Sequence, residues 1–138
     1  MAGTGTVGLN ADGNNFLGLD FPDNLTRADV SLTNGAYVDI SAGGGCSIAV
    51  NARNLNISAS ALYAGINPDL GSASSQAGDI TLNARGTTTV TNGFIYNYVA
   101  SGALGNSGNL TIETDRLSAS NDSQIATLTS GQGNAGTG

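Results

Sequence analysis

Short runs of alternating apolar and polar residues recur in the same order along this chain. The first run of each unit predicts a strand with one buried face, because its apolar residues lie two positions apart. These pairs are Val7 and Leu9, Ile48 and Val50, Ile80 and Leu82, and Leu110 and Ile112. A second run follows a short corner, with pairs at Val30 and Leu32, Leu55 and Ile57, Thr88 and Val90, and Leu117 and Ala119.

A third run follows the dipeptides Asn34-Gly35, Asn92-Gly93 and Asn121-Asp122, which accept the left-handed turn conformation. Each unit therefore predicts three strands and three corners. The units start near residues 5, 46, 78 and 108, and a period of roughly 30 residues is typical of solenoids. We predict an all-β parallel β-helix of about four triangular turns in a single domain, 1–138. The first unit is longer, so residues 12–27 are expected to form an insertion or a cap, and the loops at 64–77, 100–107 and 130–135 vary in length.

The composition fits a narrow interior. The 138 residues include 21 glycines, two prolines and no tryptophan, with 39% hydrophobic and 5% aromatic residues. Small side chains can fill such an interior when equivalent residues stack from one repeat to the next. No run of apolar residues has helical spacing, so no helix is predicted.

The charge excludes several functions. Ten acidic residues face four arginines, for a net charge of −6, and there is no lysine or histidine. Nucleic acid is therefore not expected as a partner. Histidine, the commonest zinc ligand and general base, is therefore missing. No metal or other cofactor is expected. No segment approaches the roughly 20 apolar residues that span a bilayer, so membrane insertion is not expected.

Cys46 is the only cysteine and occupies the position that is glycine in the other units, Gly5, Gly78 and Gly108. It cannot form an internal disulfide, and we interpret it as incidental or engineered. Residues 2–5 and 135–138 have the same sequence, Ala-Gly-Thr-Gly, which indicates an internal segment of a longer repetitive array. Cut solenoid ends expose strand edges, so we expect head-to-tail self-association or stacking on neighbouring solenoid turns.

Two sets of polar residues share equivalent positions. Asn10, Asn51 and Asn83 share one position, with Glu113 in the fourth unit, and are predicted to form a structural ladder of stacked amides. Asp12, Arg53, Arg85 and Asp115 follow in the next corner. Attraction is expected between Asp12 and Arg53 and between Arg85 and Asp115, in a solubilising corner.

The aromatic residues gather in Phe94-Ile95-Tyr96-Asn97-Tyr98-Val99. Alignment with Ala36, Val38 and Ile40 points Phe94, Tyr96 and Tyr98 inward, with Tyr63 beneath Tyr96, and we favour this register. A slip of one residue turns the rings outward and places Ile95 and Val99 inside. The outward rings, with Tyr63, would form a binding platform for sugars.

Other chemistry is less favoured. The run Thr87-Thr88-Thr89, with Thr91, Thr81 and Thr111, suggests an ice-binding row, but the other units do not continue it. Asp39 and Asp79 are the candidate carboxylates of a polysaccharide lyase or glycosidase, although no position carries acids in consecutive units. A calcium site formed by Asp and backbone oxygens at a corner is a further alternative, although the sequence has no Asp-rich array. No catalytic residue is assigned.

Several phrases resemble the repeats of cyanobacterial exoproteins of the filamentous haemagglutinin family. They are Gly-Asp-Ile-Thr-Leu-Asn (78–83), Gly-Asn-Leu-Thr-Ile-Glu (108–113), Asn-Asp-Ser-Gln-Ile-Ala-Thr (121–127) and Gly-Gln-Gly-Asn-Ala-Gly (131–136). The resemblance covers most of residues 24–138. It implies a right-handed β-helix, secreted through a dedicated partner pore in two-partner secretion, and a place in the repetitive shaft.

We therefore expect a non-catalytic structural or adhesive shaft segment of a secreted bacterial exoprotein, located extracellularly at the cell surface. Its loops would face glycans or other cells. The alternatives are a β-helical polysaccharide lyase or glycosidase and a self-assembling fibre building block.

Overall fold

The computed structural model describes residues 3–4, 8–11, 17–20 and 26–138, and the regular elements of these residues are all strands. The all-β prediction is confirmed, with parallel strands in stacked sheets. Among the described residues no helix is present, so none has the length and apolarity needed to cross a membrane.

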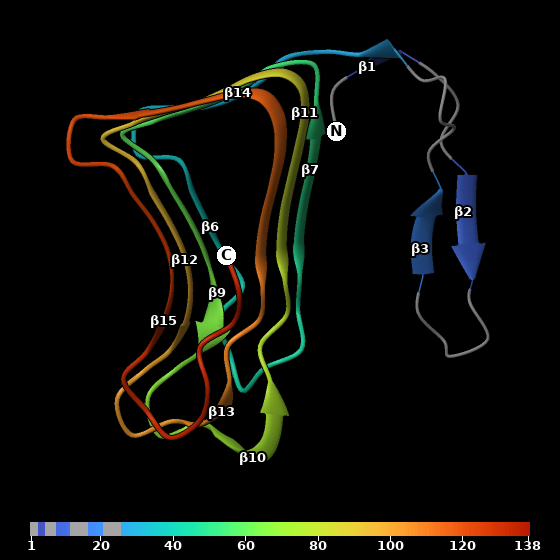
Figure 1. Ribbon diagram of the computed structural model, residues 1–138. Helices are drawn as coiled ribbons and strands as arrows, with labels where there is room; N and C mark the ends of the chain where they lie inside the picture. Colours follow the sequence, from blue (N-terminus) through green and yellow to red (C-terminus); the bar gives the residue numbers. More distant parts are fainter. Residues whose placement is uncertain (1–2, 5–7, 12–16, 21–25) are drawn as a thin grey trace.

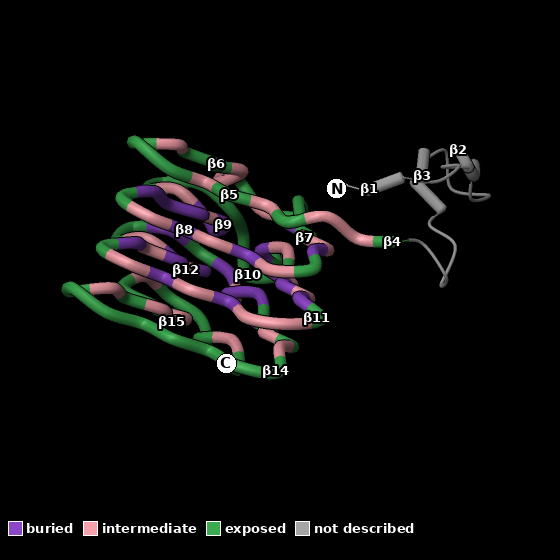
Figure 2. Tube along the Cα trace, turned by 90° about the horizontal axis from the view of Figure 1, so that it is seen from above, coloured by how far each residue is buried: buried purple, intermediate pink, exposed green. Residues whose placement is uncertain are grey.

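Most strands belong to two parallel sheets. The five-stranded sheet contains β5 (Val30–Leu32), β7 (Ile48–Ala52), β8 (Leu55–Ser58), β11 (Ile80–Thr91) and β14 (Leu110–Ser120). The four-stranded sheet contains β6 (Tyr37–Asp39), β9 (Ala61–Ile66), β12 (Phe94–Val99) and β15 (Gln124–Thr129). Strands of successive repeats lie over one another in Figure 1, and the view turned by 90° in Figure 2 shows the same strands as stacked layers.

The register brings equivalent residues of successive repeats together. Ile80 pairs with Ile48 on one side and with Leu110 on the other. In the second run, Thr88 lies between Leu55 and Leu117 in the same way. The parallel stacking thus follows the apolar pattern of the sequence.

In the third and fourth units the first and second runs form one continuous strand instead of two. Strands β11 and β14 continue through the predicted corner, and their register shifts between Ala84 and Thr87. The shift reflects unequal numbers of residues, because Arg85 and Gly86 of β11 lie against a single residue of β14, Asp115.

Two segments predicted as loops also contain strands. Strand β10 (Gly71–Gln76) pairs in parallel with β13 (Leu104–Asn106), with an irregular register between its ends. These segments differ in length, and the irregularity accommodates the difference while the ends stay paired. The loop prediction at 64–77 and 100–107 is therefore wrong for these residues.

The first strand of the first unit does not join the stack as predicted, although the later strands β5 and β6 of this unit do. Strand β2 (Gly8–Ala11) pairs antiparallel with β3 (Leu17–Asp20), and not with β7. Pairing with a strand that is close by in sequence is favoured, because closing the short loop between them costs little entropy. Strand β1 (Gly3–Thr4) pairs antiparallel with β4 (Thr26–Arg27). The expected insertion or cap at 12–27 is described only at 17–20 and 26–27, and both segments are strands.

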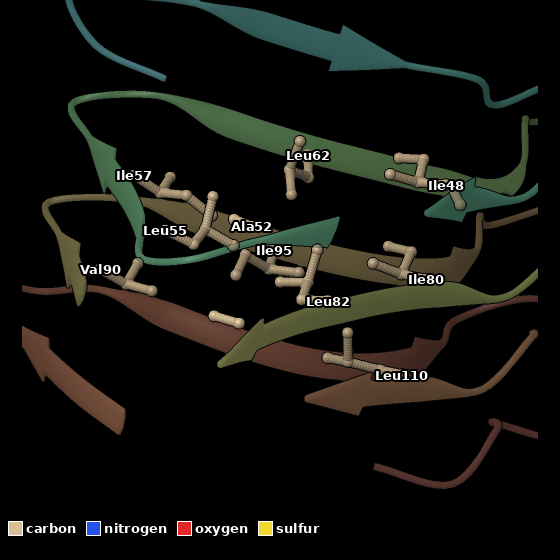
Figure 3. Packing of buried hydrophobic residues seen from close by; sticks show 12 residues of the cluster. Ile48, Ala52, Leu55, Ile57, Leu62, Ile80, Leu82, Val90, Ile95 and Leu110 are labelled. Carbon is tan, nitrogen blue, oxygen red and sulfur yellow. The ribbon is translucent and has the colours of Figure 1, made fainter. Parts of the chain in front are cut away.

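The core lies inside the stacked repeats and consists of aliphatic columns. Leu62 and Ile95 of the four-stranded sheet face Leu82 of β11 in the interior, as Figure 3 shows. The largest fully buried apolar side chains are Leu55, Ile57, Leu62, Ile66, Ile80, Leu82, Val90, Ile95 and Val99. A smaller cluster of Ile66, Ala77, Val99 and Ala103 fills the corner near β10 and β13. The interior was predicted to be filled by stacked small side chains, but leucine, isoleucine and valine fill most of it, with alanines such as Ala52 and Ala64 among them.

Candidate functional site: an aromatic face

The aromatic rings lie on the outer surface of the four-stranded sheet. Ile95 and Val99 are 0% and 1% exposed in the interior, whereas Phe94, Tyr96 and Tyr98 of the same strand are half-exposed. The inward register that the sequence favoured is therefore wrong, and the register shifted by one residue is present. Aliphatic Ile95 fits the interior because it stacks between Leu62 and Ile125.

Corner length explains the error. The corners at Asn34-Gly35 and Asn121-Asp122 have two residues with positive φ, whereas Ala59 and Asn92 are single. Tyr37, Ala61, Phe94 and Gln124 are register partners, so the two-residue corners hold one residue more before the strand. Counting from each turn dipeptide therefore misplaces β6 relative to β12 by one residue.

The rings of this aromatic face (Tyr37, Tyr63, Phe94, Tyr96 and Tyr98) contact one another. Tyr63 and Tyr96 stack with their planes 10° apart and their centroids at 5.6 Å. Tyr37 and Tyr98 meet Tyr63 at steep angles, with centroid distances of 5.0 and 6.4 Å. The tilted ring of Phe94 lies 6.0 Å from that of Tyr96. Such pairs are favourable aromatic geometries, and they hold the rings in place on the sheet.

A hollow of about 260 Å³ opens at one end of the aromatic face. Tyr37, Tyr63 and Phe94 line it, together with Ala61 and small or polar residues of the corners. In the register, the small Ala61 lies between Tyr37 and Phe94, so a gap is left between two large rings. An apolar concavity with a few polar groups is the usual form of a small-ligand site.

Polar groups flank the rings. The Tyr98 hydroxyl donates a hydrogen bond to Asn67 Oδ1 at 2.9 Å, and the Tyr96 hydroxyl donates to Gln124 Oε1. Partial desolvation is the main cause that raises the pKa of Tyr63 and of Tyr37 above the ordinary value of 10.0. Both phenols are therefore uncharged near neutral pH and can donate or accept hydrogen bonds.

Among the described residues, the strands that form the aromatic face carry no cationic side chain. The strands of the four-stranded sheet contain no arginine, and Asp39 is their one charged residue. Arg85 and Arg116 belong to the five-stranded sheet, and Arg53 lies at its bend between β7 and β8. Arg27 extends from β4 to Asn83 of β11, where it donates to Oδ1. The aromatic face thus offers rings and neutral polar groups without a cation for an anionic ligand.

The predicted asparagine ladder is only partly assembled. Asn51 and Asn83 are register partners, and the Asn83 amide donates to Glu113 Oε2 at 2.5 Å. Asn10 lies opposite Gly18 in the hairpin of β2 and β3, so its place in the ladder is wrong. The cause is that β2 has a local antiparallel partner instead of β7.

The corner arginine has a different partner from the one predicted. Arg53 pairs with Asp29, with Nη2 at 2.8 Å from Oδ2 and Nε at 2.9 Å from Oδ1. The predicted partner, Asp12, lies outside the described residues. Asp29 also accepts from the Asn54 backbone and side chain, and these contacts tie the first repeat to the second.

The two carboxylates considered for an enzyme, Asp39 and Asp79, accept hydrogen bonds from backbone N–H groups. Asp39 Oδ1 accepts from the backbone N–H of Ser41 at 2.8 Å, and Asp79 Oδ1 accepts from that of Asn109 at 2.7 Å. Among the described residues, no three His, Cys, Asp or Glu side chains gather as a metal site. Of the threonine run, Thr88 is buried, so the three hydroxyls do not form one outer row.

Tyr37 is the member of the aromatic face that sequence reasoning missed. It is the most exposed ring, at 61%. Its equivalence with Phe94 was hidden, because Phe94 follows Asn92-Gly93 directly whereas Ala36 separates Tyr37 from Asn34-Gly35. Comparison of the chain with family models, curated proteins and solved structures found no match.

Proposed function

We propose that this chain is a segment of a right-handed parallel β-helix of about four triangular turns, and that it serves as a non-catalytic shaft of a secreted bacterial surface protein resembling filamentous haemagglutinin. The parallel stacking of equivalent residues supports this proposal, since a repeat array of this kind is extended and presents regular faces. Its aromatic face binds neutral glycans at the cell surface.

The observation that carries the binding proposal is the hollow between Tyr37, Tyr63 and Phe94. Its walls are aromatic, and the apolar face of a pyranose ring can pack against such a wall. Ser60 and Asn92, which also line the hollow, supply polar groups that can hydrogen-bond to sugar hydroxyls. The glycan is neutral, because the four-stranded sheet supplies no arginine and its one charged residue is Asp39.

Affinity electrophoresis tests this function with the whole chain in gels that contain laminarin, dextran or hydroxyethyl cellulose. Polygalacturonate serves as the acidic comparison. We expect retardation by at least one neutral polymer and none by polygalacturonate. Migration that no neutral polymer changes overturns the binding proposal, and retardation by polygalacturonate alone overturns the neutral class of ligand.

Two matched variants locate the site. Ala61→Val fills the hollow with a residue that suits a strand, and we expect it to abolish retardation while the fold persists. Ala126→Val adds the same two methyl groups to the same sheet outside the hollow, and we expect it to bind normally. Equal loss or equal retention of binding in both variants contradicts the assignment of the site to the hollow.

A further inference from the structure

One column of residues requires glycine wherever another repeat precedes it. A Cβ on Gly78 would lie 1.8 Å from the carbonyl oxygen of Cys46. A Cβ on Gly108 would lie 2.2 Å from the oxygen of Gly78, and one on Gly136 would lie 1.9 Å from that of Gly108. Atoms do not approach so closely, so the column of Cys46, Gly78, Gly108 and Gly136 allows a Cβ only at its first member.

Cys46 is that first member. Its Cβ points in the direction in which a Cβ on any of the three glycines would meet the preceding repeat. By equivalence with Gly78, this direction leads toward the place where a repeat before β7 would lie. Cys46 is exposed, and β7 pairs with β11 alone among the described strands. The β7 edge is therefore open to solvent but closed at Cys46 to another repeat of the same geometry.

The chain contains a segment whose sequence fits this edge. Strand β2 ends in Leu9-Asn10-Ala11, which is identical to Leu82-Asn83-Ala84 of β11. Stacked on β7, it would place Leu9 beside Val50. Val50 is half-buried, whereas Leu82 in the same position one repeat later is 0% exposed. The column residue of this segment is Gly5 by alignment, and it lies outside the described residues.

The hydrogen-bonding groups of the edge are oriented for a parallel strand. Ile48 donates its N–H to Asp79 of the following repeat, and Arg53 donates to Ala28 of the preceding one. Since amides of alternate residues point to opposite neighbours in a parallel ladder, the N–H groups of Ala49 and Asn51 face the open edge. We propose that the Cβ of Cys46 keeps β2 off this edge, and that glycine at position 46 lets β2 stack on β7 as a parallel strand.

Hydrogen exchange of the full chain tests the proposal by comparing Cys46→Gly with Cys46→Ala, which removes the thiol but keeps the Cβ. In the glycine variant we expect exchange of the Ala49 and Asn51 amides to slow by about tenfold or more. The alanine variant should exchange like the parent chain. Unchanged exchange in the glycine variant, or equal slowing in both, overturns the proposal. Slowing that grows with protein concentration identifies a second copy as the occupant and also overturns it.

Disulfide trapping gives a second measurement. Stacking would place Asn10 beside Asn51, at a separation that a disulfide can bridge. We expect the pair Asn10→Cys and Asn51→Cys to oxidise within one molecule when residue 46 is glycine, and much more slowly when it is alanine. Equal rates in the two backgrounds, or a bond mainly between molecules, contradict the assignment.

Discussion

The side-chain oxygen of Asn97 accepts a hydrogen bond from the backbone N–H of Gly108 at 3.1 Å, inside the stack. Asn97 is 0% exposed, and its amide donates to the carbonyl oxygen of Gly78 at 2.7 Å. Its oxygen also accepts from the Ser107 hydroxyl at 3.1 Å. One buried side chain therefore satisfies the backbone of two neighbouring repeats.

Replacing Asn97 with alanine should lower the free energy of unfolding by about 2–4 kcal/mol, because it leaves buried backbone groups without partners. The backbone conformation itself accepts alanine, since Ala64 is the register partner of Asn97 in the preceding repeat. Urea unfolding measures the change, with the half-exposed Asn56→Ala as the control. A loss below about 1 kcal/mol would mean that water replaces these bonds.

Thr88 is a polar residue in an apolar column. It lies between Leu55 and Leu117 in the register and is 0% exposed, and its hydroxyl has no hydrogen-bond partner among the described residues. Thr88→Val keeps the branched shape and removes the unsatisfied hydroxyl, so we expect the free energy of unfolding to rise by about 1 kcal/mol. Thr89→Val on the outer side is the control and should change it little. Destabilisation by Thr88→Val would show that the hydroxyl is hydrogen-bonded in solution.

The contact between Asp29 and Arg53 predicts a loss of stability in acid. Hydrogen bonds from Arg53 and Asn54 are the main causes that lower the pKa of Asp29 from 3.8 to about 2. Because the folded pKa lies below the unfolded one, this carboxylate stabilises the fold above about pH 4. That stabilisation is lost as the pH falls from 3.8 to about 2.

Thermal unfolding between pH 5 and pH 2 is the measurement, on the parent chain, Asp29→Asn and Arg53→Gln. The midpoint temperature of the parent should exceed those of both variants at pH 5, and the difference should shrink as the pH falls to 2. Arg53→Gln should keep part of the acid dependence, because Asn54 still donates to Asp29, whereas Asp29→Asn removes the titrating group. If the difference in midpoint temperature is unchanged at pH 2, the carboxylate of Asp29 is not the cause of the acid-dependent loss of stability.

The apolar pattern predicted the strands of the stack because side-chain alternation and burial decide them locally. Ile48 aligns with Ile80, and Leu55 with Thr88, as their positions in the repeat indicate. The orientation of the aromatic face could not be obtained in this way, because it depends on corner length. One additional residue with positive φ, such as Gly35, reverses which residues of the following strand face the interior.

The position of β2 shows a different limit. Its residues match the repeat, and the pattern alone places it beside β7. The obstacle is a single Cβ on Cys46, and its consequence follows from the distances across the glycine column, such as that between Gly78 and Cys46. Sequence similarity identifies an equivalent strand but does not report whether a neighbouring backbone leaves space for it.

Replacing alanine with glycine should change the free energy of unfolding in opposite directions at Ala59 and at Ala36. Ala59 has φ of 46°, in the left-handed region, whereas Asn34, Asn92 and Asn121 take comparable corner positions in the other repeats. Side chains with a Cβ are strained there, and glycine is not. Ala59→Gly should therefore raise the free energy of unfolding by about 0.5–1 kcal/mol.

Ala36 is the matched control because it borders the corresponding corner and is not among the residues with positive φ. Ala36→Gly relieves no strain and increases the freedom of the unfolded chain, so it should lower the free energy of unfolding by about 0.5–1 kcal/mol. Urea unfolding of both variants measures the two shifts. Destabilisation of similar size in both would mean that Ala59 carries no strain, and that the second repeat turns this corner as easily with alanine as the others do with asparagine.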